Sequence, residues 1–290
     1  MPAYPSPLRY PGGKGRLSDY IKLILQKNDL VGCNYSEPYA GGSSVALDLL
    51  FEEYANQIHI NDLSLPIYSF WYSVLYKTET ICQLIWETDV NIDEWHRQKE
   101  IWSQEKEDLL ALGFATFFLN RTNRSGILKA GVIGGKNQAG KWKLNARFNK
   151  ENLLKRIKKI ARFNSRIHIY NEDAEVFIEK QNSKETSKEK FFYLDPPYYI
   201  KGKGLYDNFY EHDDHESVSN SVENMDSPWI VSYDNHPEIK KFYEGFNSVV
   251  YKLSYSAQKK YKGSEIIFYS PKLVIPQVGT PLKISDEKLF

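Results

Sequence analysis

The fold of this chain is decided by the stretch Phe191-Phe192-Tyr193-Leu194-Asp195-Pro196-Pro197-Tyr198. Four apolar or aromatic residues that run into a carboxylate and two prolines predict a buried parallel strand ending at its carboxyl end. Neither proline can donate a backbone hydrogen bond, so the chain must leave the sheet at this point. In open α/β sheets ligands bind at this edge, and we therefore expect Asp195 and Tyr198 to face a crevice.

A carboxylate, rigid proline carbonyls and an exposed ring suit an exocyclic amine on a planar base. Such an amine is a poor nucleophile because its lone pair is delocalised into the ring. A carboxylate and a proline carbonyl can accept its two N–H hydrogens and draw the nitrogen toward a tetrahedral geometry, while the tyrosine stacks on the base. Four residues recur by chance, however, and a plain strand-ending turn is the alternative.

The tetrapeptide Asp195-Pro196-Pro197-Tyr198 resembles the catalytic motif of the adenine-N6 DNA methyltransferases, specifically the Dam-like (D12) class, in which the cofactor motif precedes the catalytic one. The resemblance covers roughly residues 7–270 and rests on four spaced motifs in the family's order. It implies that Asp195, Pro196, Pro197 and Tyr198 are catalytic. It also implies S-adenosyl-L-methionine as cofactor, double-stranded DNA as substrate, a target adenine flipped out of the duplex, and no metal.

Residues 7–14, Pro-Leu-Arg-Tyr-Pro-Gly-Gly-Lys, predict a glycine-rich turn that opens into a helix over 15–26. This is not a phosphate-binding loop, because no strand precedes it and Arg16 stands where Ser or Thr is needed. An ordinary loop and helix start would explain the stretch if it stood alone. It resembles the family's cofactor-side motif, which implies that Tyr10, Gly13 and Lys14 contact the cofactor.

A second glycine-rich turn lies at 35–44, Tyr-Ser-Glu-Pro-Tyr-Ala-Gly-Gly-Ser-Ser, and predicts a strand, a tight loop and a helix capped by Ser43 or Ser44. The family usually shows aromatic-x-Gly-x-Gly here, and Ser43 replaces the last glycine. That departure also weakens a dinucleotide-binding interpretation, which needs a full Gly-x-Gly-x-x-Gly. By resemblance the loop's cofactor residues are Glu37, Tyr39 and Gly41.

Two further acids follow predicted strands. Asp62 ends the run 57–62 about twenty residues beyond the glycine loop, where an acid hydrogen-bonds ribose hydroxyls in nucleotide-binding α/β folds. A cap for the helix after Ser64 is its alternative. Asp173 follows the strand 166–170 and by resemblance lies near the cofactor adenine, although a helix cap explains it equally well. Asp195 itself is also expected beside the cofactor.

Charge is strongly segregated along the chain. Residues 121–166 hold fourteen Lys or Arg against one acid, Glu151, a net charge of +13, so the remainder carries −12 of the overall +1. Such segregation favours a polyanion-binding surface over an ordinary solvated face. The run 120–126, Asn-Arg-Thr-Asn-Arg-Ser-Gly, resembles the family's target-recognition region, and the glycines that follow suggest a hairpin loop lying along a groove. We expect DNA contacts from Asn120, Arg121, Asn123, Arg124, Lys136, Lys141, Lys155 and Lys159.

We therefore expect an α/β fold, a Rossmann-like methyltransferase sheet with an inserted, mainly helical DNA-recognition domain. The expected domains are 1–63 with 165–275 for catalysis, 64–164 for target recognition, and a tail over 276–290. No apolar run approaches the ~20 residues of a membrane span, so a cytoplasmic location and association with the nucleoid are expected. Cys33 and Cys82 predict neither a disulfide nor a metal site.

Two alternatives stay open. An amine methyltransferase of the wider superfamily could act on cytosine N4 or on RNA, and a catalytically silent relative could bind DNA without modifying it. The intact Asp195-Pro196-Pro197-Tyr198 and Lys14 argue against the silent relative. The sequence does not give the recognition site, the oligomeric state, or whether a cognate restriction endonuclease accompanies the protein.

Overall fold

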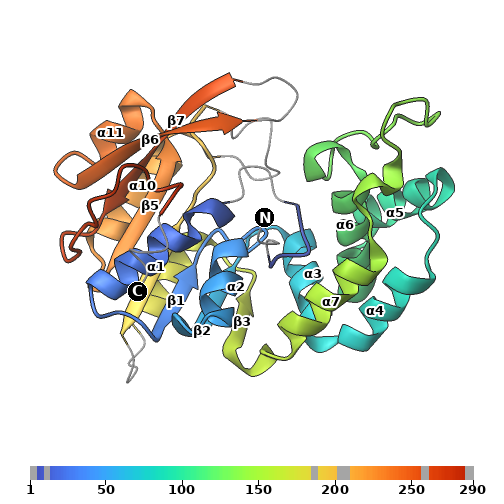
Figure 1. Cartoon of the computed structure of the whole chain (residues 1–290), viewed down its shortest axis with the longest axis horizontal. Helices are drawn as coiled ribbons and strands as arrows, with labels where there is room; N and C mark the ends of the chain where they lie inside the picture. The colour runs from blue at the N-terminus through green and yellow to red at the C-terminus, as the bar shows by residue number, and fades with distance from the viewer. Residues whose placement is uncertain (1–4, 10–13, 184–188, 201–209, 256–260, 285–290) are drawn as a thin grey trace. The chain divides into compact units, whose positions relative to one another are not determined.

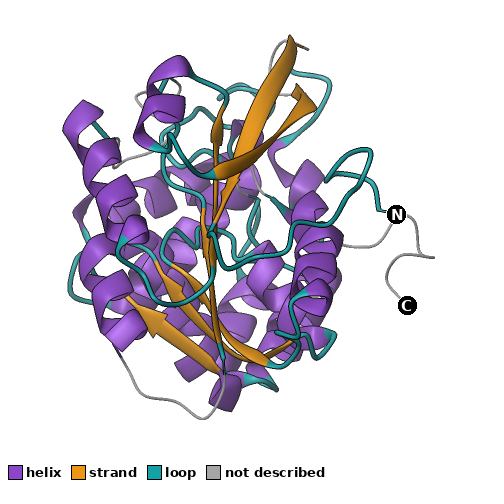
Figure 2. Ribbon diagram, turned by 90° about the vertical axis from the view of Figure 1, so that its left-hand side faces the viewer, coloured by secondary structure: helices purple, strands orange, loops and turns teal. Residues whose placement is uncertain are grey.

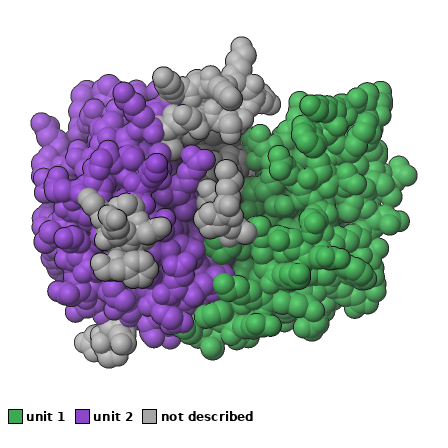
Figure 3. Space-filling model, viewed as in Figure 1, with its two compact units in different colours: residues 1–13, 64–171 green, residues 14–63, 172–290 purple. Residues whose placement is uncertain are grey.

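The computed structural model describes residues 5–9, 14–183, 189–200, 210–255 and 261–284. The chain forms two compact units (Figure 3). Unit 1 comprises residues 1–13 and 64–171, and unit 2 comprises residues 14–63 and 172–290. The domain boundaries expected from the sequence, 1–63 with 165–275, 64–164 and 276–290, stay a prediction. Within unit 1, the Asn120 side chain of the helical part binds the backbone of Arg9.

A mixed seven-stranded sheet forms the core of the α/β fold, with strand order β3-β2-β1-β4-β5-β7-β6 (Figures 1 and 2). The strands are β1 (Cys33–Glu37), β2 (Ala55–Asn61), β3 (Ile167–Tyr170), β4 (Lys190–Leu194), β5 (Trp229–Asp234), β6 (Asn247–Tyr255) and β7 (Tyr261–Tyr269). Strand β1 pairs in parallel with β2 and β4, β4 pairs in parallel with β5, and β7 pairs antiparallel with both β5 and β6. This confirms the expected α/β fold.

The order of the strands reverses between β1 and β4. Strands β2 and β3 continue outward from β1, whereas β5, β7 and β6 continue outward from β4. Ligands in open α/β sheets bind at such a switch point, outside the carboxyl ends of the strands. The two loops that begin there follow Glu37 and Leu194, so both sequence motifs reach the same edge of the sheet.

Five helices and a 3-10 turn lie in the described residues of unit 2. They are η1 (Gly15–Leu17), α1 (Ser18–Lys27), α2 (Ser44–Phe51), α8 (Ala174–Ser183), α10 (His212–Glu223) and α11 (Pro237–Phe242). Alternate residues of β4 face opposite sides of the sheet. Phe192 and Leu194 pack in a cluster with residues of α8, α10 and α11. Phe191 stacks on Tyr35 of β1, with ring centroids 6.1 Å apart. Both faces of β4 are apolar, as a central parallel strand requires.

Unit 1 is helical, and its main helices are α3 (Leu65–Tyr76), α4 (Thr78–Glu87), α5 (Ile92–Gln104), α6 (Leu109–Thr122) and α7 (Lys150–Ala161). Helix α6 begins at Asp108, whose side chain accepts hydrogen bonds from the N–H groups of Leu110 and Ala111. It packs closely on α3 at Gly113, where a Cβ atom would come within 2.3 Å of the Ser69 carbonyl. Three short 3-10 turns, η2 (Arg124–Gly126), η3 (Leu144–Arg147) and η4 (Asn164–Arg166), connect the rest.

The segment between α6 and α7 differs from the hairpin loop suggested by its glycines. It contains one isolated antiparallel bridge, between Asn123 and Val132, and otherwise turns and 3-10 helix. Gly134 and Gly135 have φ angles of +85° and +77°, which interrupt any extended strand. The Gln138 side chain holds the loop together, donating to the carbonyls of Ile133 and Gly135 and accepting from the backbone of Leu144.

Candidate active site

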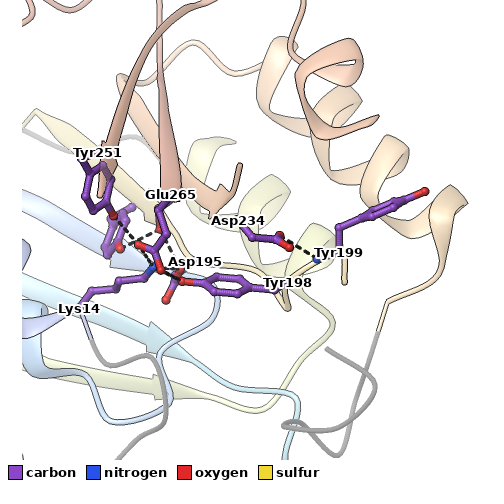
Figure 4. Close-up of polar contacts among 9 residues, drawn as sticks. Lys14, Asp195, Tyr198, Tyr199, Asp234, Tyr251 and Glu265 are labelled. Carbon is purple, nitrogen blue, oxygen red and sulfur yellow. Dashed lines mark hydrogen bonds and ion pairs between the residues drawn. The ribbon is translucent and has the colours of Figure 1, made fainter. Parts of the chain in front are cut away.

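Lys14 and Asp195 meet at the carboxyl end of β4 (Figure 4). Lys14 precedes η1, and its ammonium lies 3.3 Å from Asp195 Oδ1. The Ser232 hydroxyl, on the neighbouring strand β5, donates to the same oxygen at 2.7 Å. The Tyr193 hydroxyl lies 2.9 Å from Ser232 Oγ and must be the donor there, because the serine hydrogen is directed to Asp195. Two residues far apart in the sequence therefore share one site.

Glu265 on β7 completes this cluster and is buried, with 1% of its surface exposed. Its Oε2 accepts hydrogen bonds from the Lys14 ammonium at 2.8 Å and from the Tyr251 hydroxyl at 2.5 Å. Its Oε1 accepts the hydroxyl of Tyr198, which in turn accepts a hydrogen bond from Lys14. The Lys14 ammonium also lies 4.8 Å from the centre of the Tyr198 ring. One ammonium thus bridges two carboxylates and the motif tyrosine.

Burial and charge move the pKa values of these groups in different directions. Burial raises the pKa of Asp195 to about 6, although Lys14 acts against that rise. Glu265 is buried as well, yet Lys14 and two tyrosine hydroxyls hold its pKa below the ordinary value. Burial lowers the pKa of Lys14, but the attraction of Asp195 and Glu265 outweighs it and the net shift is upward. At neutral pH the cluster therefore holds one cation and two anions.

The backbone after the motif is held by a second acid. Asp234, at the end of β5, accepts the N–H of Tyr199 at 3.0 Å through Oδ1 and that of Ile200 at 3.3 Å through Oδ2 (Figure 4). Pro196 is buried and Pro197 half-buried. With two prolines that cannot rotate freely in φ and two anchored amides beyond them, the motif loop has a fixed path.

Glu37 and Asp62 lie at the glycine loop, and both accept hydrogen bonds from backbone N–H groups of the chain. Glu37 Oε1 accepts the N–H of Ala46 at 3.1 Å and the Tyr35 hydroxyl at 2.9 Å, so this acid caps helix α2. The expected serine cap is not observed, because Ser43 makes no side-chain cap bond and adopts a left-handed conformation with φ +46°. Burial raises the pKa of Glu37 to about 8. Asp62 Oδ2 accepts the N–H of Gly41 at 2.9 Å.

The other residues assigned to the cofactor lie in different surroundings. Tyr39 is half-buried, and its hydroxyl accepts a hydrogen bond from Tyr210 at 3.1 Å. Asp173 is exposed, and its Oδ1 accepts the N–H of Glu175 at 2.9 Å, which is the helix-cap arrangement. Tyr10 and Gly13 lie outside the described residues. The cofactor roles of all these residues stay predictions.

Asn120 and Asn123 are buried in unit 1, at 1% and 0% exposure, and this counts against the direct DNA contacts predicted for them. The Asn120 side chain makes two hydrogen bonds to the backbone of Arg9. It accepts one from the N–H and donates one to the carbonyl, each at 2.7 Å. Asn123 accepts from the Trp95 indole at 2.7 Å and donates to the carbonyl of Leu128 at 2.8 Å. A buried amide with satisfied hydrogen bonds would have to leave this arrangement to reach a base.

Arginines gather in the same unit. Arg121 Nε donates to the carbonyl of Arg147 at 2.7 Å, and Arg156 donates to the carbonyl of Ser6 at 2.9 Å. Burial, followed by the charges of Arg9, Arg156 and Arg147, lowers the pKa of Arg121. In the part of unit 1 that the structure describes, no salt bridge joins these arginines to an acid. Their uncompensated charge is suited to an anion.

The remaining predicted DNA contacts are exposed side chains. These are Arg124, Lys136, Lys141, Lys155 and Lys159. Helix α7 is amphipathic, since Leu153, Ile157 and Ile160 are buried while Lys155 and Lys159 face outward. Point charges on one helix face are suited to phosphates.

Among the described residues, no group of three or more His, Cys, Asp or Glu is placed to hold a metal ion. Both cysteines are buried and free. His215 is buried at 1% exposure, with Nδ1 3.1 Å from the Tyr233 hydroxyl. No helix in the described part of the chain is long and apolar enough to cross a membrane.

Sequence reasoning missed three residues of the site, Ser232, Asp234 and Glu265. Each is a polar residue in or at the end of a strand that is otherwise apolar, and all three are buried. A polar residue at a buried strand position is a signal for a site or a structural network. The sequence alone did not show that these strands would flank β4.

Comparisons with known proteins agree with this geometry. The α/β sheet and the position of Asp195 after β4 are those expected from the sequence motifs. The chain belongs to the D12 class N6 adenine-specific DNA methyltransferase family, whose model matches residues 10–257. This confirms the family expected from the sequence motifs, and membership implies the use of S-adenosyl-L-methionine.

Two solved structures are similar at 10% sequence identity. One is described as a candidate RNA methyltransferase from Pyrococcus horikoshii, with a TM-score of 0.42, covering 90% of this chain and 85% of that chain. The other is described as a candidate methylase from Haemophilus influenzae, with a TM-score of 0.33, covering 87% of this chain and 98% of that chain. Likeness at this level does not bear on activity. A comparison with curated proteins found no match.

Proposed function

We propose that this protein transfers the methyl group of S-adenosyl-L-methionine to N6 of a flipped-out adenine in duplex DNA. The observation that carries the proposal is the state of Asp195 at the switch point of the sheet. Ser232 and Lys14 both contact Oδ1, and within the described residues no group bonds Oδ2. Membership of the D12 family supports adenine in DNA as the target.

Asp195 would act on the amine directly. Its Oδ2 accepts one N–H of the adenine amine, and the carbonyl of Pro196 accepts the other. These two bonds turn the N6 lone pair out of the ring plane, which makes the nitrogen a better nucleophile. The Tyr198 ring was expected to be exposed, but it is buried at 3% exposure, so it would have to become accessible before it could stack on the base. Because Asp234 and the two prolines fix the loop, these groups hold the amine without reorganisation during the reaction.

When bound, S-adenosyl-L-methionine would supply an electrophilic methyl group on a cationic sulfur. The chain's acids fit such a ligand. Asp62 lies beside the glycine loop, as a carboxylate that receives a ribose hydroxyl does. The N6 nitrogen gains the methyl group and loses one proton. Asp195, with a pKa raised to about 6, can take up that proton and pass it to water.

Unit 1 would hold the DNA. The uncompensated arginine cluster around Arg121 and the lysines on the outer face of α7 supply positive charge for phosphates. A base within a duplex cannot reach the methyl group, so the target adenine must flip, at a cost of a few kcal/mol. Phosphate contacts on both sides of the flipped nucleotide can offset that cost.

The test is transfer of tritiated methyl groups from S-adenosyl-L-methionine into duplex DNA, single-stranded DNA and RNA of matched sequence. Digestion to nucleosides and chromatography should place the label in N6-methyladenine, with duplex DNA preferred. Asp195→Ala, measured in parallel, should lose the activity while its circular dichroism spectrum is unchanged. Label in N4-methylcytosine or in RNA, or none in any substrate, would contradict the proposal.

A further inference from the structure

We propose that Glu265 is a positioning residue for methyl transfer, which binds the Tyr198 hydroxyl and the Lys14 ammonium so that Asp195 keeps a free oxygen that is a strong hydrogen-bond acceptor for the target amine. This inference rests on the proposed function. It assigns a role to a residue on β7 that is separated by 70 positions from Asp195 and that lies outside the glycine-rich and Asp-Pro-Pro-Tyr motifs.

The position of Glu265 follows from the sheet. Its partners across the sheet are Asp234 on β5 and Tyr251 on β6. Ile266 and Phe268 point into the apolar cluster on one face, so Glu265 points to the opposite face. Alternation places Ser232 on the same face as Glu265, since its neighbours in β5 belong to that cluster too. Asp195 and Glu265 therefore lie over one face of the sheet, with Lys14 between them.

The distances show how the ammonium is shared. Lys14 Nζ lies 2.8 Å from Glu265 and 3.3 Å from Asp195, so its stronger contact is with Glu265. The two contacting oxygens are at most about 6 Å apart, because both touch the same nitrogen. In a buried site two like charges at this distance raise each other's pKa. If Glu265 were neutral, the whole charge of Lys14 would fall on Asp195, which would then be a weaker hydrogen-bond acceptor for the amine.

Glu265 also fixes Tyr198. The tyrosine hydroxyl is held between Lys14 and Glu265 Oε1. Its ring position is thus set at the hydroxyl end by Glu265 and at the backbone end by the loop that Asp234 anchors. A neutral amide in place of Glu265 would weaken the first of these constraints.

Below pH 7, the other titrating groups near this site do not obscure the effect of Asp195 ionisation on the rate of methyl transfer. The groups that face Asp195 and Glu265 from the surrounding strands and loops are Lys14, Tyr35, Glu37, Tyr193, Tyr198, Asp234 and Tyr251. The pKa values of Tyr35, Tyr193 and Tyr251 are raised by burial. The pKa of Glu37 is about 8, and that of Lys14 is raised. Asp195 is therefore the group expected to set the acidic limb of the rate profile.

The experiment measures single-turnover methyl transfer from pH 5 to 8, with DNA and S-adenosyl-L-methionine saturating. Wild-type protein should show an acidic limb near pH 6, the pKa of Asp195. Glu265→Gln should move that limb down by about one pH unit, because Asp195 loses its like-charged neighbour. Its rate at pH 8 should fall about tenfold, since Lys14 then binds Asp195 alone.

Two controls separate this role from a purely structural one. Tyr251→Phe removes a neighbouring hydrogen bond but no charge, so its acidic limb should stay in place. The double variant Lys14→Gln with Glu265→Gln removes the ion pair as a unit, so Asp195 loses both the attraction of Lys14 and the repulsion of Glu265. Its acidic limb should return toward or above that of the wild type, even though its rate is low.

The outcomes are distinguishable. An active wild type with an unmoved limb in Glu265→Gln would overturn the positioning role and leave the proposed function intact. A wild type inactive on every substrate would overturn both. If Glu265→Gln does not fold, the double variant decides, because a limb shifted below that of the wild type would contradict the charge argument.

Discussion

Replacing Asp195 with asparagine should make the protein more stable and nearly inactive. The pKa of Asp195 is raised by burial from 3.8 to about 6. A raised carboxyl pKa means that the folded state binds the proton more tightly than the unfolded state does. The ionised form therefore costs folding free energy. That cost is absent below about pH 4, grows between about pH 4 and 6, and is complete above about pH 6.

The size of the effect follows from the shift. About two pKa units at 1.36 kcal/mol each give roughly 3 kcal/mol as an upper value at pH 8. The introduced asparagine has nearly the same shape as aspartate, can accept the Ser232 hydroxyl, and leaves Lys14 paired with Glu265. Turnover should nevertheless fall about 100-fold or more, because the amide is a weaker acceptor for the amine.

The assay is urea unfolding of both proteins at pH 8, 6 and 4.5, beside methyl transfer at pH 8. We expect the stability gain of Asp195→Asn to be largest at pH 8 and to shrink toward zero at the lowest pH. Asp226→Asn, at an exposed position, is the matched control and should change stability little at any pH. A variant less stable than the wild type at pH 8, or a gain independent of pH, would refute the reasoning.

Three further predictions concern the loop, the cofactor and the DNA. Ser43→Gly should stabilise the protein by about 1 kcal/mol, because Ser43 has φ +46°, a conformation that glycine adopts without strain. Ser44→Gly, at the first residue of α2, should instead destabilise the protein. Thermal melting of both variants tests this difference. Asp62→Ala and Lys14→Ala should each weaken S-adenosyl-L-methionine binding by roughly 1–3 kcal/mol in calorimetric titration, and unchanged affinity in both would remove them from the cofactor site. Lys155→Ala and Lys159→Ala should weaken binding to all DNA sequences alike and reduce the salt slope by about one counterion each. Sequence-dependent losses would instead assign these lysines to base reading.

The sequence by itself determined the parts of the site that are local. Asp195, the two prolines and Tyr198 are contiguous, and the apolar run before them is a buried strand wherever it lies in the sheet. Its stop at the carboxyl edge follows from proline chemistry. The glycine loop after β1 and the acid after β2 are likewise set by short-range spacing. The α/β fold and the family were therefore predictable from the sequence.

The sequence could not show which polar residues meet across strands. Asn120 and Asn123 were expected to reach DNA because of the residues beside them, but Asn120 on α6 and Asn123 just after it are both buried in unit 1. The hairpin suggested between α6 and α7 is an irregular loop, because two glycines with positive φ and the Gln138 side chain favour turns.

Only the tertiary structure decided that Glu265, Ser232 and Lys14 surround Asp195. They come from β7, β5 and the segment before η1, and strand order is set by the packing of whole strands and helices rather than by any local pattern. One buried ammonium then serves two carboxylates because the low dielectric of the interior makes an unpaired charge costly. The ionisation of Asp195 is thus a property of the folded sheet.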